Sequence, residues 1–212
     1  MYNLLTRSFQ AVARPAAYAL DWDEPNLLIG KDRFKKLPND LIDQNISRLL
    51  IVTDEGIRDS GLLDDFIEGL EDKNIVYTIY DQVKPNPPID ICEEIAIAFN
   101  HLHADAMLAI GGGSVLDAAK AAGIAAIKPE KPLESLTGLM TVRKDTPFLI
   151  AVPTTAGTGS EGTLAAVVSD NKNRKKVTIM DTHLIPDVAV LDAELTKTLP
   201  QSMVAGPGMD AL

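Results

Sequence analysis

Short, unbroken apolar runs alternate along the chain with longer segments in which apolar residues recur at helical spacing. The apolar runs cover residues 49–52, 75–80, 106–110 and 148–152. Helical spacing is found between them, in residues 60–72, 89–102 and 114–127. Strands that alternate with helices of this length are typical of βαβ units. Because unbroken apolar strands are covered on both faces, the pattern predicts an α/β fold with a mostly parallel sheet and flanking helices.

Beyond residue 163 the pattern changes to shorter apolar segments, at residues 164–169, 176–180 and 188–191. These segments predict short strands, and the polar stretch 170–173 between the first two predicts a turn. Pro200 and Pro207 then bracket the beginning of a further segment. The pattern therefore predicts one main domain followed by the start of another.

The first twenty residues contain Arg7 and Arg14 and no acidic residue. Their apolar side chains fall near one face of a possible helix, at Leu4, Leu5, Phe9 and Val12. Amphipathic segments with arginine occur in targeting peptides and also in surface helices packed on a domain. We treat residues 1–26 as an amino-terminal arm for which either role is open.

Composition and charge narrow the possible function classes. With 46% hydrophobic and 24% charged residues, the chain has the balance of an ordinary globular protein. Its net charge of −10 argues against a broad nucleic-acid-binding surface, which requires clustered lysine and arginine. Every apolar run is shorter than the roughly 18 residues that a membrane span requires, so we expect no membrane insertion. The single cysteine, Cys92, cannot form an internal disulfide, which fits a reducing compartment and predicts a cytoplasmic protein.

A glycine-rich loop lies between the third predicted strand and the helix that follows it. It consists of Gly111, Gly112, Gly113 and Ser114, and Asp117 follows on the helix. Glycines let a ligand approach the backbone closely, and the amides and positive dipole end of a helix N-terminus favour phosphate. Ser114 and Asp117 also have the spacing of a capping box, so a glycine-rich turn before a well-capped helix, with no ligand, stays open as an alternative. The loop matches neither the G-x-G-x-x-G fingerprint nor the P-loop.

A second loop, residues 153–161, follows the predicted strand at 148–152 and contains Thr154, Thr155 and Thr158. Ligands of open α/β sheets bind outside the carboxyl ends of the strands. Two hydroxyl- and glycine-containing loops at that edge favour ligand binding. Thr158 and Glu161 again have capping-box spacing, so a structural role stays open.

Two single residues at the same edge are further candidates. Asp54 ends the first predicted strand, where a carboxylate can accept hydrogen bonds from ribose hydroxyls and repel a 2′-phosphate. Asn86 lies in the proline-rich turn after the second strand. Each residue also fits a structural role in a cap or a turn.

The sequence contains no complete set of acid–base or nucleophilic groups. Residues 159–162 come near a G-x-S-x-G elbow, but Thr158 occupies the first glycine position. His101 and His103 lie two residues apart on a predicted helix, so they face different sides and make a poor metal pair. We therefore predict that these residues do not form a complete set of catalytic groups.

The motifs resemble those of one enzyme family, the iron-containing (group III) alcohol dehydrogenases. The longest matches are GGGSVLDAAK at residues 111–120 and AVPTTAGTGSE at 151–161. Shorter ones follow the family order: VTD at 52–54, PNP at 85–87, PDVAVLDAELTKTLP at 186–200 and GMDAL at 208–212. The resemblance implies a Rossmann-like NAD(P)-binding domain, residues 27–199, and then an all-helical domain that holds a divalent metal, usually iron, with zinc as an alternative. The implied reaction is hydride transfer between nicotinamide and an alcohol or aldehyde.

The resemblance also implies roles for single residues. Asp54 would contact the adenosine ribose and favour NAD over NADP, while Lys176 and Leu191 would lie near the nicotinamide ribose and ring. Asp210 would be the first metal ligand. The full set of implied cofactor-binding residues is Asp54, Asn86, Gly112, Gly113, Ser114, Asp117, Thr154, Thr155, Thr158, Lys176 and Leu191.

The chain departs from this family at its carboxyl end. The family has a histidine four residues after the aspartate that matches Asp210 and two more downstream, and these positions lie beyond Leu212. One carboxylate is not a site for iron or zinc, which need three or four ligands, so we expect no tight metal binding. Residues 200–212 would be the start of a truncated metal domain, and we expect little or no alcohol oxidation by these residues alone.

Two alternatives stay open at this stage. One is a non-catalytic nucleotide-binding module or the product of a degraded gene. The other is a relative of glycerol dehydrogenase or dehydroquinate synthase, which share the overall fold. For the alcohol dehydrogenase itself, an apolar surface left where the helical domain packs would favour aggregation or homo-oligomers.

Overall fold

A six-stranded sheet forms the centre of the protein, for which the computed structural model describes residues 24–197, Leu199 and Met209. The strands lie in the order β1-β9-β6-β4-β2-β3, and every neighbouring pair is parallel. Their bounds are β1 Asn26–Ile29, β2 Arg48–Val52, β3 Val76–Tyr80, β4 Ala106–Gly111, β6 Phe148–Pro153 and β9 Val188–Leu191. The predicted α/β fold with a mostly parallel sheet and flanking helices is confirmed.

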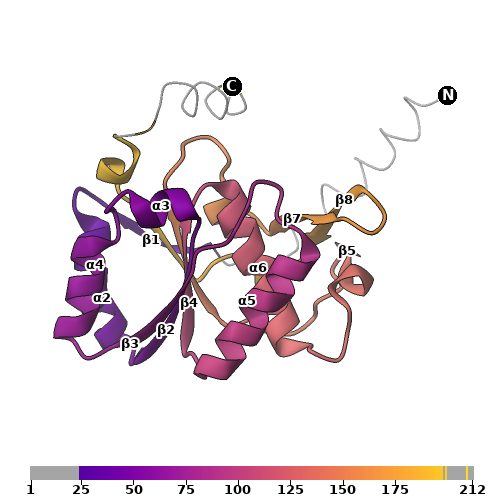
Figure 1. Ribbon diagram of the computed structural model, residues 1–212, viewed down its shortest axis with the longest axis horizontal. Helices are drawn as coiled ribbons and strands as arrows, with labels where there is room; N and C mark the ends of the chain where they lie inside the picture. The colour runs from indigo at the N-terminus through magenta and orange to yellow at the C-terminus, as the bar shows by residue number, and fades with distance from the viewer. Residues whose placement is uncertain (1–23, 198, 200–208, 210–212) are drawn as a thin grey trace.

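Helices cover both faces of this sheet (Figure 1). One face carries α2 (Arg33–Asp43) and α4 (Asp64–Asp72), and the other carries α5 (Ile89–Leu102) and α6 (Gly113–Ile127). Between α2 and α4, the rings of Phe34 and Phe66 stack with centroids 4.5 Å apart. The short helix α3 (Glu55–Asp59) lies at the edge where the strands end.

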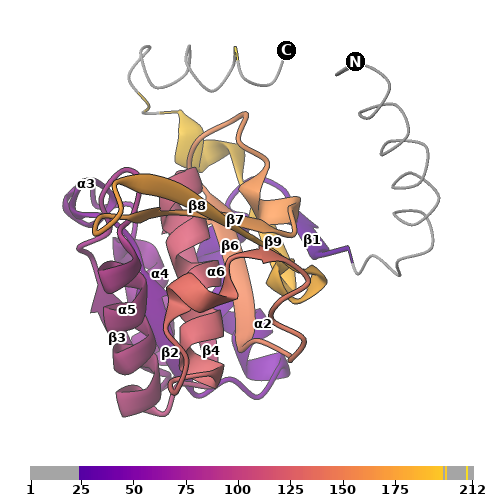
Figure 2. The same cartoon turned by 90° about the vertical axis from the view of Figure 1, so that its right-hand side faces the viewer.

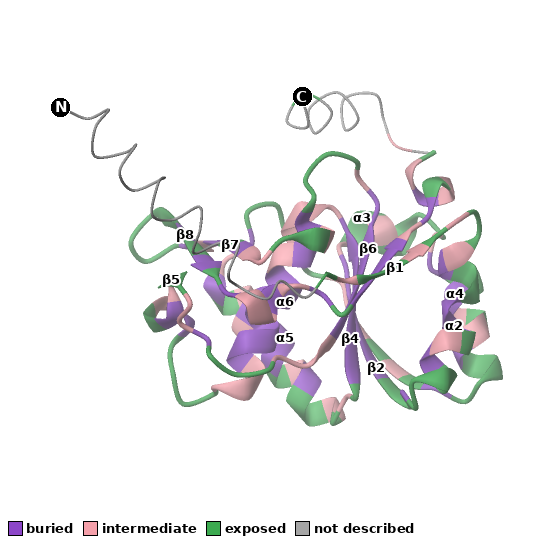
Figure 3. Ribbon diagram, turned by 180° about the vertical axis from the view of Figure 1, so that it is seen from behind, coloured by how far each residue is buried: buried purple, intermediate pink, exposed green. Residues whose placement is uncertain are grey.

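Alternate residues of each central strand enter two separate hydrophobic clusters, one on each face. In β2, Leu50 and Val52 pack toward α5 and α6, whereas Leu49 and Ile51 pack toward α2 and α4. All four side chains are fully buried, which explains why the apolar run is unbroken. Figure 3 shows the same burial along the sheet and on the inner faces of the helices.

A second, smaller sheet lies outside the main one, on the side of α5 and α6 (Figure 2). It contains β5 (Gly138–Leu139), β8 (Lys175–Met180) and β7 (Ala165–Asp170) in that order, and β7 and β8 form an antiparallel hairpin. The predicted turn joins them, and Asp170 stabilises it by accepting hydrogen bonds from the backbone and side chain of Asn173. The hairpin was predicted only as two strands.

Three features of the fold differ from the sequence pattern. Strand β1 and helix α2 were not predicted, because β1 has only four residues and α2 contains Pro38. Packing of Phe34, Leu37 and Leu41 in the core holds α2 together in spite of the proline. The helix predicted over 60–72 is present but begins later, at Asp64, because Gly61 has φ 77°, a left-handed conformation that keeps residues 60–63 out of α4.

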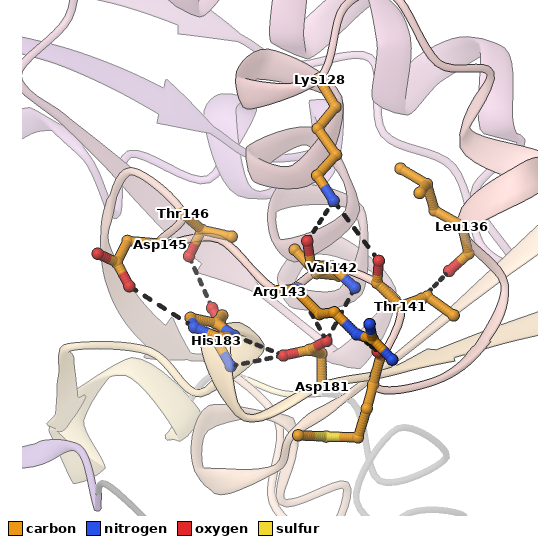
Figure 4. A network of polar contacts seen from close by, with 10 residues as sticks. Lys128, Leu136, Thr141, Val142, Arg143, Asp145, Thr146, Asp181 and His183 are labelled. Carbon is orange, nitrogen blue, oxygen red and sulfur yellow. Dashed lines mark hydrogen bonds and ion pairs between the residues drawn. The ribbon is translucent and has the colours of Figure 1, made fainter.

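A polar network ties the segment before β6 to the residues after β8 (Figure 4). The fully buried carboxylate of Asp181 accepts hydrogen bonds from the backbone amides of Val142 (2.9 Å) and His183 (3.3 Å). Its Oδ1 also lies 2.6 Å from Nδ1 of His183. On the other side of the segment, Lys128 Nζ donates to the carbonyls of Thr141 and Val142. The network therefore fixes an irregular segment to α6 and to the end of β8.

We expect Asp181→Asn to lower the free energy of unfolding by about 1–3 kcal/mol near neutral pH, because a buried charge-assisted network loses its charge. Burial by itself raises the pKa of Asp181, but hydrogen bonds from His183 and from the Val142 and Arg143 amides outweigh burial and lower it. A lowered pKa stabilises the fold above the ordinary value and loses that stabilisation as the pH falls through the native pKa. The difference between the two proteins should therefore shrink below about pH 4.

Urea unfolding followed by circular dichroism, near pH 7 and at acidic pH, measures this difference. Asp145→Asn is the matched control, because its fully exposed carboxylate lies 3.6 Å from the other ring nitrogen of His183, and we expect little change. A loss of stability in Asp181→Asn that stays constant with pH would contradict this account.

Candidate functional site

The carboxyl ends of β2, β3, β4 and β6 meet at one edge of the sheet, at the top of Figure 1. A cleft of about 690 Å³ opens there. Open α/β sheets bind ligands at this edge, so the position agrees with the sequence prediction. The cleft is lined by Asp54, Glu55, Gly56, Ile57, Ser60, Leu62, Asp81, Gln82, Val83, Lys84, Pro85, Gly112, Gly113, Ser114, Thr154, Thr155, Thr158, Leu195 and Leu199.

The N-terminus of α6 forms the floor of the polar part of the cleft. Gly112 is the N-cap residue, and no side chain caps the helix. The first amides of a helix have no intrahelical partners, so the amides at Gly113 and Ser114 are available to an anion at the positive end of the dipole. The capping box predicted for Ser114 and Asp117 is wrong. Both side chains bond elsewhere, which leaves this helix end free for a ligand.

The loop after β6, residues 154–163, which we name the threonine loop, faces this helix end. Thr154 is buried, and its amide donates to the carbonyl of Gly111 (2.9 Å). A Cβ added at Gly113 would lie 3.1–3.3 Å from atoms of Thr158, and one added at Gly112 would lie 3.4 Å from Thr155 Oγ1. The two glycines therefore allow the threonine loop to pack directly on the start of α6.

The second predicted capping box, Thr158 with Glu161, is also wrong. The short 3-10 helix η2 (Ser160–Gly162) begins after Gly159, which has φ 64°, and no side chain caps it. The left-handed conformation of Gly159 prevents the extended N-cap geometry that a capping box requires. Thr158 lines the cleft instead.

Asp54 lies at the other end of the cleft, where it caps the short helix α3. Its Oδ1 accepts a hydrogen bond from the amide of Ile57 (3.0 Å). Asp81, which follows β3, also lines the cleft and forms an ion pair with Arg58 of α3. Together with Glu55, these residues give this end three carboxylates, of which Asp81 is already paired with Arg58, and Lys84 adds an ammonium. The free amides at the start of α6 are therefore the better place for an anionic group.

Seven of the predicted residues share the cleft, namely Asp54, Gly112, Gly113, Ser114, Thr154, Thr155 and Thr158. Asn86 lies beside it, and its amide donates to Ser114 Oγ (3.3 Å). Asp117 turns away, and its Oδ2 accepts from the amide of Val167 (3.1 Å), while burial raises its pKa. Lys176, exposed on β8, and Leu191, at the end of β9, are not among the lining residues. Asp210 lies outside the described residues.

The apolar walls of the cleft were not predicted from the sequence. Ile57, Leu62 and Val83 line one side, and Leu195 and Leu199 are contributed from beyond β9. Val83 could have been found from the sequence, because it follows the carboxyl end of a predicted strand, where ligands of open α/β sheets bind. Leu195, on the short 3-10 helix η4 (Ala193–Thr196), reaches the cleft only because β9 lies beside β6.

Residues 24–197, Leu199 and Met209 contain no cluster of three or more histidine, cysteine, aspartate or glutamate side chains that could hold an ion. Over the same residues, no helix combines the length and the apolar character needed to cross a membrane.

Comparison with known proteins identifies relatives of this chain. Residues 25–193 match the family model of the iron-containing alcohol dehydrogenases. Lactaldehyde reductase of Escherichia coli (strain K12) is 35% identical over 184 residues, which are 86% of this chain and 48% of that enzyme. NAD-dependent methanol dehydrogenase of Bacillus methanolicus is 32% identical over 188 residues, 89% of this chain and 49% of that enzyme.

A solved structure agrees with these sequence matches. The alcohol dehydrogenase from Oenococcus oeni superimposes with a TM-score of 0.84 at 30% identity, over 90% of this chain and 50% of that one. The chain thus spans about half the length of the relatives that it matches. With a family match over residues 25–193, the chain belongs to the iron-containing alcohol dehydrogenase family.

Proposed function

We propose that this chain is the NAD-binding part of an alcohol dehydrogenase that transfers hydride between nicotinamide and a primary alcohol or aldehyde. The observation that carries the proposal is the uncapped N-terminus of α6 at Gly112 and Gly113, opposite the threonine loop in a cleft of about 690 Å³. A structure in complex with NAD⁺, sulfoacetaldehyde reductase from Bifidobacterium kashiwanohense, is 30% identical with a TM-score of 0.79, over 90% of this chain and 50% of that one. That likeness supports the choice of dinucleotide.

The residues of the cleft suit the adenosine and pyrophosphate parts of NAD. A Cβ at Gly112 or Gly113 would fill the space between α6 and the threonine loop, where the pyrophosphate has to approach the backbone amides. Asp54 would accept hydrogen bonds from the adenosine ribose, and the apolar side chains of Ile57 and Leu62 would flank the adenine. The bound cofactor would supply the carbon that gives or accepts the hydride. The chain's own contribution is to bind and orient it.

The roles implied for the other residues belong to this proposal. Asn86 would border the adenosine end of the cofactor, and Asp117, on α6, would belong to the same cofactor-binding set. Lys176 and Leu191 would approach the nicotinamide ribose and ring. They do not line the cleft, so any contact from them would lie outside the pocket that holds the rest of the set.

The domain boundaries are part of the same proposal. Residues 27–199 would form the cofactor domain, with β1 beginning one residue earlier at Asn26. Residues 1–26 would be the arm, and residues 200–212 would begin a helical metal domain in which Asp210 is the first ligand to Fe²⁺ or Zn²⁺. The described residues contain no cluster of three or more such ligand side chains.

We further propose a cytoplasmic homo-oligomer. Cys92 is a free, buried thiol, which suits a reducing compartment. Exposed apolar side chains, among them Leu27 and Ile29 on the edge strand β1 and Leu139 on the small sheet, offer surface for association.

Fluorescence titration with NADH and a turnover assay test the function together. We expect the 212-residue chain to bind NADH, and to oxidise ethanol or propanediol at a rate near background with added Fe²⁺, because Asp210 alone supplies too few ligands. Rapid alcohol oxidation would contradict the expected inactivity of the 212-residue chain, although it would support the proposed hydride transfer. Absence of NADH binding by the folded chain would refute the proposed function.

A further inference from the structure

Lys120 is a buried lysine that the proposed function does not use. It lies on α6, two turns beyond the end that faces the cleft, and it is 1% exposed. Its ammonium donates to Thr163 O (2.6 Å), Thr163 Oγ1 (3.1 Å) and Ala165 O (3.2 Å). All three of these partners are uncharged oxygens, and together they satisfy the three N–H donors. A buried charge is costly, so its retention calls for a specific structural role.

The two residues that Lys120 holds mark the far end of the threonine loop. The near end is fixed by the bond from the Thr154 amide to Gly111 O (2.9 Å), at the junction of β4 and α6. Between these ends, Gly157 and Gly159 have φ values of 113° and 64°, and regular structure is limited to the short η2. A glycine-containing loop of this kind keeps one conformation only if both ends are anchored.

We propose that Lys120 is a positioning residue, whose buried ammonium fastens the far end of the threonine loop to α6 and thereby sets the affinity of the cleft for a dinucleotide. The effect on dinucleotide affinity rests on the proposed function, whereas the fastening of the loop does not. Lys120 does not touch the ligand. It acts by holding Thr155 and Thr158 against Gly112 and Gly113.

The charge of Lys120 gives this role a pH dependence. Burial lowers the pKa of the ammonium to about 8, although the carboxylates of Asp117 on α6 and Glu161 on the threonine loop favour the charged form. A neutral amine has one donor fewer and makes weaker bonds, so the anchor weakens as the pH rises through about 8. Burial raises the pKa of Cys92 to about 12, so this thiol does not titrate over the same range.

Lys120→Met keeps an unbranched side chain only one atom shorter and removes the ammonium. Lys128→Met is the matched control, because Lys128 also lies at α6 and donates to two backbone carbonyls, those of Thr141 and Val142, away from the cleft. For each protein we would measure hydrogen exchange of the amides in residues 154–163 and the dissociation constant for NADH between about pH 7 and pH 9.

We expect faster exchange in the threonine loop and about tenfold weaker NADH binding in Lys120→Met, with a change below about twofold in Lys128→Met. The NADH affinity of the unchanged protein should fall by about fivefold over the pH range, whereas that of Lys120→Met should stay flat. If Lys120→Met does not fold, Thr163→Val tests the same anchor, with a smaller loss of about threefold.

Equal exchange and equal affinity in the two lysine variants would overturn the inference, because Lys120 would then contribute to stability alone. A pH dependence that persists in Lys120→Met would also count against it. If the unchanged chain binds no NADH, the proposed function and the effect on affinity both fail. Hydrogen exchange in residues 154–163 still decides whether Lys120 positions the loop.

Discussion

Gly113→Val is expected to weaken NADH binding by about a hundredfold or more, while the chain keeps its fold. A Cβ at this position already lies 3.1–3.3 Å from the side chain of Thr158, and the two methyl groups of valine extend further. Either the threonine loop moves away or the valine side chain occupies the space above the first amides of α6. In both cases the anion loses its place at the helix N-terminus.

Gly162→Ala is the matched control for this variant. Gly162 lies in the same loop, but a Cβ there meets no atom within 4 Å. Its NADH affinity should therefore stay within about twofold of the unchanged chain. Titration of both variants, with circular dichroism to verify the fold, measures the effect. Tight NADH binding by Gly113→Val would show that the dinucleotide does not use the N-terminus of α6.

The second large effect is expected on the choice between NADH and NADPH. Asp54→Asn retains an oxygen that can cap α3 and removes the negative charge from the cleft. A carboxylate at this position repels a 2′-phosphate and accepts hydrogen bonds from the free ribose hydroxyls. We therefore expect the ratio of NADPH to NADH affinity to rise by about tenfold to a hundredfold.

Glu55→Gln provides the control, because it removes one charge from the neighbouring position in the same cleft. If Asp54 acts through direct contact with the ribose, the ratio should change by less than about threefold in Glu55→Gln. Titrations with both dinucleotides at low and physiological salt separate contact from long-range repulsion, since salt screens the latter. Equal changes in the two variants would show that only the summed charge of the cleft matters.

Much of the fold was predictable because the strands β2, β4 and β6 are buried on both faces. Their apolar runs and the helical spacing of α5 and α6 are direct consequences of that burial, so the elements could be placed to within a residue or two. Strand β1 was missed, since Leu27 and Ile29 at the edge of the sheet are exposed and leave no such run. Helix α2 was missed because core packing overrides the unfavourable Pro38.

The residues of the candidate site were also predictable only in part. The residues that follow strand ends could be predicted, because the carboxyl ends of parallel strands meet at one edge. Asp117 has the spacing of a capping residue and yet bonds to Val167, which comes near only when β7 packs on α6. Likewise, no spacing along the chain indicates that Lys120 reaches Thr163 or that Leu195 closes the cleft.

The alternation of strands and helices, the parallel sheet and the two loops at its carboxyl edge could all be predicted from the amino-acid sequence. These depend on hydrophobic periodicity and on backbone chemistry, both of which are local. Spacing along the chain does not show that the start of α6 lacks a side-chain cap, that the threonine loop packs on Gly112 and Gly113, or that the ammonium of Lys120 bonds to Thr163. These contacts join residues that are distant in the chain. They form because a buried polar group without a hydrogen bond is costly, and the packing of the elements determines which partners lie close enough.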